Sequence, residues 1–263
     1  MARKSLKNVC RLIECANQNQ PIEKLFVNDL KRSIELTADN NSYKPSQTYK
    51  PSGLHCIRNM YYQITGKEPD TSSSSACLVG ICESGTDRHE RVQNAVAQMK
   101  DNGIDCEYVD VAEYVKSRNL DYLEVKSKRG NETHLYYKDL NMSFLCDGII
   151  RYKGKYYILE IKTESIYKWQ SRQNVNPDHI LQGTAYSVAL RIDNVLFLYI
   201  NRDNCDMKAY MLNVSDEMKN NLISRINECD GYASRFICPP KPDDVSKKAC
   251  EYCNYRKSCR EDN

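Results

Sequence analysis

The sequence lacks the run of about 18 apolar residues that a membrane-spanning helix needs. Its longest apolar stretch, from Val195 to Ile200, has the length of a β-strand. Hydrophobic residues make up 41% of the chain and charged residues 28%, a composition that is typical of globular proteins and excludes a fibrous or disordered one. We therefore expect no association with a membrane.

The sequence also lacks an excess of charge of one sign. It has 38 Lys and Arg against 35 Asp and Glu, so its net charge of +3 does not by itself indicate a nucleic-acid-binding protein. Contacts with nucleic acid would have to come from local basic groups, although such groups are ordinarily solvated surface. These groups are Lys126, Lys128 and Arg129, and near the C-terminus Lys247, Lys248, Arg256, Lys257 and Arg260.

The first residues are basic but lack the apolar block of a secretory signal, which predicts a chain that stays in the reducing cytoplasm. An odd number of cysteines, 13, in that compartment argues against a disulfide framework. We therefore expect the cysteines to be metal ligands or small buried side chains. Burial is predicted for Cys77, Cys82, Cys146 and Cys205, which have apolar or strand-like neighbours.

The order of helical and strand patterns predicts a mixed α/β fold, in which helices flank a mixed sheet. Helical spacing covers residues 5–36, with a break near Pro21, and recurs at 54–65, at 76–100 with an interruption near Gly85, at 176–190 and at 215–234. Strand patterns cover residues 120–125, 134–137, 143–152, 155–162, 194–200 and 207–214. This organisation predicts a helical N-terminal region and loop at 1–50, a core at 51–236 and a Cys-rich tail at 237–263.

The segment FLCDGIIRYKGKYYILEIKTES contains the most informative pattern in the chain. A two-residue hairpin turn at Lys153 and Gly154 would place Asp147 directly opposite Glu160. Lys162 lies two residues beyond Glu160, so it would point to the same face of the sheet. The register of one turn thus brings two carboxylates and an ammonium group together.

Two facing carboxylates repel each other unless a divalent cation lies between them. Oxygen ligands suit Mg²⁺ or Mn²⁺. A lysine beside such a site could position the attacking water and stabilise charge on a phosphate. The alternative is an ordinary cross-strand salt bridge, in which Lys162 neutralises Glu160.

Asp147 followed by Glu160, Ile161 and Lys162 resembles the D-x(n)-E-x-K signature of the PD-(D/E)xK nuclease superfamily. The order of further residues extends the resemblance, since His89 lies upstream on a predicted helix. The chain resembles the RecB-like branch in particular, which includes the CRISPR-associated adaptation exonuclease and its phage relatives. The resemblance begins near residue 52 and leaves the first 45 or so residues uncovered.

Downstream, Gln182 and Tyr186 form a Q-x-x-x-Y pair on one face of a predicted helix, where they could reach DNA or the scissile phosphate. Upstream, His89 is followed by Glu90, and either could face a metal. The apolar face that continues through Val92 and Val96 favours His89.

The resemblance implies a restriction-endonuclease-like core and a divalent-metal-dependent deoxyribonuclease. It implies that the metal ligands are His89, Asp147, Glu160 and the carbonyl of Ile161. It also implies that the catalytic residues are Asp147, Glu160, Lys162, Gln182 and Tyr186.

The tail contains Cys250, Cys253 and Cys259 in a C-x2-C-x5-C spacing. Three thiols so close together in a reducing compartment are a strong signal for a metal site, because a two-residue gap lets two sulfurs reach one centre. A fourth ligand is needed, and either Cys238 or Cys56 could supply it.

Cys56 is followed by Arg58, Tyr61 and Tyr62, which resembles the upstream cysteine motif of the RecB-like iron-sulfur nucleases. The resemblance implies a [4Fe-4S] cluster held by Cys56 together with the tail cysteines, and zinc is the alternative. Such a cluster would connect the tail to the region before the core.

These observations predict a metal-dependent DNA nuclease that acts as an exonuclease on DNA ends, in recombination, repair or the processing of CRISPR or phage DNA. The alternative is a non-catalytic DNA-binding or partner-docking module with the same fold. The presence of Asp147, Glu160 and Lys162 together favours the nuclease, because a degenerate site would be expected to have lost at least one of them.

Overall fold

The computed structural model describes residues 21–39, 46–70, 75–243, 245–251 and 253–262. The first of the two N-terminal helices predicted from the sequence lies outside these residues. The chain divides into two compact units. Unit 1 comprises Met1–Tyr43 and Thr71–Glu83, and unit 2 comprises Lys44–Asp70 and Ser84–Asn263. Unit 2 thus contains the predicted Cys-rich tail and most of the predicted core, whereas residues 71–83 of that core belong to unit 1.

The described helices are α2 (Ile22–Asp39), the short 3-10 helix η1 (Pro51–Gly53), α3 (Ile57–Ile64), α4 (Ala76–Ala97), α5 (Val111–Ser117), α6 (Ile166–Ser171), α7 (Pro177–Leu190), α8 (Asp216–Ser234), α9 (Lys247–Glu251) and α10 (Ser258–Glu261). The described strands are β1 (Cys106–Val109), β2 (Leu123–Arg129), β3 (Glu132–Tyr137), β4 (Met142–Cys146), β5 (Gly148–Tyr152), β6 (Lys155–Glu164), β7 (Asn194–Asn201) and β8 (Met207–Asn213). None of the described helices is long and apolar enough to cross a membrane.

Unit 1 contains α2 and the beginning of α4. The Glu35 carboxylate accepts a hydrogen bond of 3.0 Å from the backbone N–H of Ala76, which joins the two segments of the unit. Cys77 and Cys82 lie on this part of α4 and are exposed, so the prediction that they are buried is wrong. Their apolar neighbours Leu78 and Ile81 are exposed as well, and the apolar pattern is therefore not a core pattern here.

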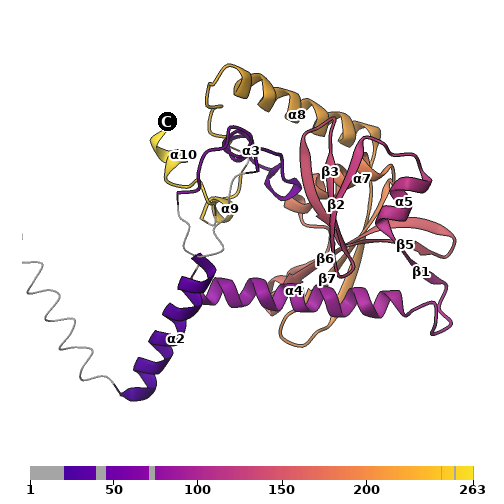
Figure 1. Cartoon of the computed structure of the whole chain (residues 1–263), viewed down its shortest axis with the longest axis horizontal. Coiled ribbons are helices and arrows are strands. Elements are labelled where there is room, and N and C mark those ends of the chain that lie inside the picture. The colour runs from indigo at the N-terminus through magenta and orange to yellow at the C-terminus, as the bar shows by residue number, and fades with distance from the viewer. Residues whose placement is uncertain (1–20, 40–45, 71–74, 244, 252, 263) are drawn as a thin grey trace, which may run out of the picture. The chain divides into compact units, whose positions relative to one another are not determined.

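Unit 2 contains two sheets, which Figure 1 shows with their flanking helices. The larger sheet has the strand order β1-β5-β6-β7-β8, and the smaller has the order β2-β3-β4. β6 and β7 are parallel, whereas the other neighbouring strands are antiparallel. The prediction of a mixed α/β fold with a mixed sheet is confirmed.

The hairpin of β5 and β6 has the turn that the sequence predicts. Lys153 and Gly154 both have positive φ, 49° and 79°, as a two-residue type I′ turn requires. Tyr152 pairs with Lys155, and the ladder continues to Gly148 opposite Leu159.

The long strand predicted at residues 143–152 is instead divided at Asp147. β4 ends at Cys146 in the smaller sheet, and β5 begins at Gly148 in the larger one. A side chain at Gly148 would collide with the Tyr108 ring, since a Cβ atom there would lie 2.7 Å from Tyr108 Cε2. Asp147 therefore lies at the crossing between the sheets, one residue outside the ladder.

The two faces of the larger sheet are covered by different helices. Ile158 belongs to the core cluster that includes residues of α7, whereas Ile161 belongs to a second cluster that includes Val92 of α4. Because side chains alternate along a strand, Glu160 and Lys162 share the α7 face with Ile158. This alternation is the one that the sequence predicts.

A glycine lets α7 lie close to the sheet. A Cβ atom at Gly183 would lie 2.9 Å from Phe197 Cζ and 3.1 Å from Leu212 Cδ2. We therefore expect Gly183→Ala to lower the free energy of unfolding by about 1–3 kcal/mol, because the helix or the ring must shift. Gly231→Ala in α8 is the matched control, since nothing lies within 4 Å of its Cβ position. Urea unfolding of both variants checks this, and equal midpoints would contradict the proposed close packing.

Candidate active site and cysteine cluster

Glu160 and Lys162 of β6 meet Gln182 of α7 in a closed network. Lys162 Nζ lies 2.6 Å from Glu160 Oε1 and donates to Gln182 Oε1 at 3.0 Å. Gln182 Nε2 donates to the same Glu160 oxygen at 2.7 Å. The structure thus brings together three of the residues that the sequence singles out, and the amide of Gln182 fixes both charged partners.

Tyr186 lies one helical turn beyond Gln182 and is 3% exposed. Gln182 Nε2 donates to the Tyr186 hydroxyl at 2.7 Å, and that hydroxyl donates to the carbonyl of Leu145 at 3.3 Å. The two side chains share one helix face, as predicted. The hydroxyl of Tyr186 is buried and holds Gln182 in place.

Asp147 is 6% exposed and reaches β6 from the crossing between the sheets. Its Oδ2 accepts a hydrogen bond of 2.7 Å from the backbone N–H of Ile161. The N–H and C=O groups of a strand residue point to the same strand edge, so the Ile161 carbonyl faces the edge on which Asp147 lies. Gln93 fixes this segment, since its Nε2 donates to the Asp147 carbonyl at 2.7 Å.

His89 of α4 and Glu132 of β3 complete the cluster. His89 Nδ1 lies 3.4 Å from Asp147 Oδ1 and 4.0 Å from Glu132 Oε1. One ligand atom from each of these three residues lies within 4.8 Å of the other two. Glu90 is exposed, whereas His89 faces Asp147. The choice of His89 over Glu90, which rests on the apolar face of the predicted helix, thus agrees with the structure.

The sequence interpretation missed Glu132. The sequence predicts a hairpin here whose turn is the whole of KSKRGNE, residues 126–132. The structure instead places residues 126–129 in β2 and Glu132 at the start of β3, so the predicted turn is too long. No local signal, however, indicates that this end of the hairpin lies against Asp147.

The cluster is rich in buried negative charge. Burial, reinforced by the charge of Asp147, raises the pKa of Glu160 to about 7, even though the nearby Lys162 ammonium acts to lower it. Burial and the charge of Asp147 also raise the pKa of Glu132. For His89, burial lowers the pKa, but the hydrogen bond to Asp147 and the nearby carboxylates outweigh it and the pKa is raised.

This donor set fits a divalent cation. Carboxylate and carbonyl oxygens suit Mg²⁺ or Mn²⁺, and one imidazole is compatible with Mn²⁺. Glu160 Oε2 is buried and has no hydrogen-bond partner among the described residues. The salt bridge with Lys162 involves the other oxygen, Oε1, and therefore leaves Oε2 without a partner. A bound cation would give Oε2 a partner.

The four cysteines of the predicted cluster line one cavity of about 420 Å³. Cys56 lies at the start of α3, Cys250 within α9, and Cys259 within α10, with Cys253 between the last two. Figure 1 shows α3, α9 and α10 gathered at one end of unit 2. Residues separated by almost 200 positions thus share one cavity.

Hydrogen-bond donors point at two of the sulfurs. Arg58 Nη1 lies 3.5 Å from Cys259 Sγ, and the backbone N–H of Tyr255 donates to Cys253 Sγ at 3.4 Å. Asn59 Nδ2 is 3.9 Å from the same Cys253 sulfur. Donors of this kind stabilise sulfur ligands of an iron-sulfur cluster and tune it.

Cys238, the other candidate for the fourth ligand, does not line this cavity. Its sulfur instead lies 3.5 Å from the Tyr62 hydroxyl. The geometry therefore favours Cys56.

The tail is also connected to α3 and the residues after it by ordinary polar contacts. Arg58 Nε donates to the carbonyl of Pro239 at 2.7 Å, and Tyr62 donates to Asp262 Oδ2 at 2.8 Å. Asp70 accepts from the backbone N–H of Ser258 at 2.9 Å. The position of the tail thus does not rest on the cysteines alone.

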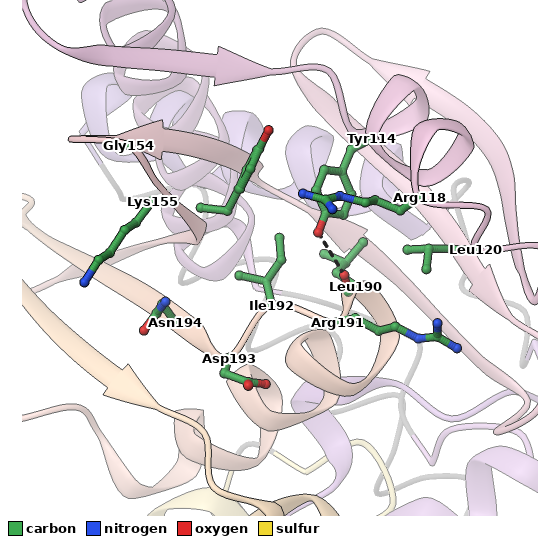
Figure 2. Close-up of a pocket in the computed structure, with 11 residues that line it drawn as sticks. Tyr114, Arg118, Leu120, Gly154, Lys155, Leu190, Arg191, Ile192, Asp193 and Asn194 are labelled. Carbon is green, nitrogen blue, oxygen red and sulfur yellow. Dashed lines mark hydrogen bonds between the residues drawn. The ribbon is translucent and has the colours of Figure 1, made fainter.

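A further cavity, of about 560 Å³, lies between α5, the beginning of β6 and the end of α7 (Figure 2). Arg118, Lys155 and Arg191 line it, and Tyr114 donates to the carbonyl of Leu190 at 3.3 Å. It contains none of the candidate site residues. Lys155 begins β6, whereas Lys162 lies near the end of that strand, so this cavity and the carboxylate cluster are separate.

No protein-family model matches the chain, and no curated protein matches it. Among solved structures, the chain is similar to one described as "Crystal structure of SSO0001", with 15% sequence identity and a TM-score of 0.46. The similarity covers 90% of this chain and 98% of that one. The nuclease resemblance seen in the sequence remains a hypothesis.

Proposed function

We propose that the protein is a divalent-metal-dependent DNA nuclease that hydrolyses phosphodiester bonds and acts as an exonuclease on DNA ends. The observation that carries this proposal is that β6 holds Asp147 beside His89, through the Ile161 N–H, and also carries the paired Glu160 and Lys162. Carboxylates that can hold a divalent ion, next to an ammonium group and a carboxylate oxygen without a hydrogen-bond partner among the described residues, fit metal-assisted phosphodiester hydrolysis.

The proposed metal ligands are His89, Asp147, Glu160 and the carbonyl of Ile161. A Mg²⁺ or Mn²⁺ ion bound there would polarise the scissile phosphate and make water a stronger nucleophile. The hydrogen bond from the Ile161 N–H to Asp147 Oδ2 leaves Oδ1 of that carboxylate on the side of His89. The backbone of β6 therefore orients Asp147 before any ligand binds.

Lys162 is the proposed catalytic cation. Its side chain is 22% exposed, and Glu160 and Gln182 hold its ammonium group. From there it can orient a water molecule and offset negative charge that develops on the phosphate. Gln182 fixes the direction of the ammonium group, and Tyr186 in turn fixes Gln182.

We assign a [4Fe-4S] cluster, with a structural role, to the cavity lined by Cys56, Cys250, Cys253 and Cys259. Thiols of this kind persist in a reducing compartment, which is consistent with the cytoplasmic location that we propose. The cluster would stabilise the tail against α3, in addition to the contacts of Arg58 and Tyr62.

Cleavage of linear and closed circular DNA by protein purified without oxygen tests the proposal. We expect end-labelled linear DNA to be shortened in the presence of Mn²⁺ and to survive in EDTA. Closed circular DNA should survive in both, since an exonuclease needs an end. DNA binding without cleavage at any metal concentration would instead support a non-catalytic binding module and contradict the nuclease.

DNA affinity is expected to depend on a local basic track, because the net charge is only +3. Charge reversal of Lys247 and Lys248 together should reduce the slope of log K against log salt by about 0.9 for each phosphate that these lysines neutralise in the wild-type complex. Lys247 lines the cysteine cavity, and the side chain of Lys248 lies outside the described part of the structure.

The matched control reverses Lys153 and Lys155 at the β5–β6 turn, which changes the net charge equally. Fluorescence anisotropy over a series of salt concentrations gives the slopes. The control should keep the wild-type slope, and a wild-type slope for the Lys247 and Lys248 double variant as well would show that these lysines do not bind phosphates.

A further inference from the structure

The hairpin of β2 and β3 delivers an additional carboxylate to the proposed metal site. Arg129 pairs with Glu132 across the two-residue turn, and Gly130 in that turn has a φ of 58°. Glu132 is thus the first residue of β3, and the turn sets its position. The hairpin belongs to the smaller sheet, whereas Glu160 and Lys162 belong to the larger one.

Two contacts hold the tip of this hairpin against the elements that carry the other ligands. The Tyr108 hydroxyl lies 2.8 Å from the carbonyl of Asn131 and 2.9 Å from the carbonyl of Asp147. Asn131 Nδ2 donates to Asn94 Oδ1 of α4 at 2.8 Å. Asn131, the residue next to Glu132, is therefore bonded directly to the helix that carries His89, and the Tyr108 hydroxyl connects it to the Asp147 segment.

The side chain of Glu132 points into the cluster. It is 15% exposed, and its Oε1 is 4.0 Å from His89 Nδ1. Its ligand atom and those of His89 and Asp147 all lie within 4.8 Å of one another. A shared metal ion could contact all three atoms after small side-chain movements.

Charge gives a reason for a cation at this position. Glu132 is held beside the carboxylate of Asp147, and among the described residues its ion pair is with His89 rather than with a lysine or arginine. Two neighbouring carboxylates are unfavourable unless they share a cation. Glu160 is 97% buried and interacts electrostatically with both Asp147 and His89. It adds a further oxygen, Oε2, that has no hydrogen-bond partner among the described residues.

We propose that Glu132 binds the same divalent ion as His89 and Asp147, as a ligand from outside the D-x(n)-E-x-K hairpin. The ion would then connect the β2–β3 hairpin to the larger sheet. This inference rests on the proposed function, since it adds a ligand to the same site.

Calorimetric titration with Mn²⁺ tests the assignment. We expect Glu132→Gln to weaken Mn²⁺ binding at least about tenfold, as the loss of groups that hold a metal does. Glu132→Asp should also weaken it, because the charge is kept but the shorter side chain falls back from the ion. Glu124→Gln is the matched control, since Glu124 lies on the same hairpin, is exposed and pairs with Lys126 at 2.7 Å.

Wild-type affinity in Glu132→Gln would overturn the proposal. Wild-type affinity in Glu132→Asp would overturn it as well, because it would show that only the charge matters and not direct ligation. Hydrogen exchange of the wild-type protein gives a second measurement that needs no variant. Mn²⁺ should slow exchange at residues 128–133, and unchanged exchange there would contradict a metal-bound hairpin tip.

The failure of this inference and the failure of the proposed function are distinguishable. If the wild-type protein neither binds Mn²⁺ nor cleaves DNA, the proposed function fails. A different result would be a wild-type protein that binds Mn²⁺ and cleaves DNA, an Asp147→Ala variant that loses both activities, and a Glu132→Gln variant that binds Mn²⁺ like the wild-type protein. In that case the proposed function stands, and only the assignment of Glu132 fails.

Discussion

Asp147→Ala is expected to abolish DNA cleavage and to weaken Mn²⁺ binding, whereas Lys162→Ala is expected to abolish cleavage alone. Asp147 contributes one of the few anionic oxygens of the site, and its Oδ1 lies 3.4 Å from His89 Nδ1. Its removal should cost at least about tenfold in Mn²⁺ affinity. Cleavage by either variant should fall by about 10²- to 10⁴-fold, the range for loss of a group that acts on the reacting atoms.

Mn²⁺ binding by Lys162→Ala should persist or strengthen. In the wild-type protein, the ammonium lies 2.6 Å from Glu160 Oε1 and competes with a metal ion for that carboxylate. Its removal leaves Gln182 as the donor to Glu160 and takes a positive charge away from the site. Calorimetric Mn²⁺ titration paired with a nuclease assay measures both effects in the same preparations.

Lys219→Ala is the matched control for Lys162→Ala. The Lys219 side chain is 24% exposed, against 22% for Lys162, and it too pairs with carboxylates, at Asp193 and Asp216. This control should cleave DNA at the wild-type rate. If Lys162 forms only a structural salt bridge, both lysine variants should lose some stability, and the folded fraction of each should cleave normally.

Cys56→Ala is expected to lose its iron and much of its solubility, as Cys250→Ala should. Both cysteines line one cavity with Cys253 and Cys259, so removal of either leaves three protein ligands for a cluster that needs four. Cys238→Ala should keep its iron, because Cys238 lies outside that cavity. Iron and zinc contents of protein purified without oxygen give the comparison, together with the absorption spectrum.

Each outcome for the cysteine variants has a definite meaning. A brown wild-type protein and colourless Cys56→Ala and Cys250→Ala variants support the cluster and its fourth ligand. Normal iron in Cys56→Ala would show that the fourth ligand is wrong, and a colourless, zinc-containing wild-type protein would show that the metal is wrong. Arg58 and Tyr62 also hold the tail, so loss of metal should loosen the tail without releasing it fully.

The features that could be predicted from the sequence are those fixed by local geometry. The positive φ angles at Lys153 and Gly154 form the turn that sets the β5–β6 register. Strand alternation then places Glu160 and Lys162 on one face, and the position of Gln182 one helical turn before Tyr186 places those two together.

The features that the sequence did not reveal depend on contacts between distant segments. Asp147 lies at the end of the ladder, next to Gly148, where the Tyr108 ring, about 40 positions away, leaves no room for a side chain. Glu132 joins the cluster at a hairpin tip that the Tyr108 hydroxyl connects to the Asp147 segment. The exposure of Cys77 could not be read from its apolar neighbours, since burial depends on what covers a helix and not on the helix alone.

The most direct test of the central claim is the rate at which end-labelled linear DNA is degraded in Mn²⁺, measured side by side for the wild-type protein and Lys162→Ala. The proposed function predicts degradation by the wild-type protein that stops in EDTA and resumes with excess Mn²⁺, and a rate for Lys162→Ala that is lower by about 10²- to 10⁴-fold. Equal rates for the two proteins, or no degradation by either, would contradict it.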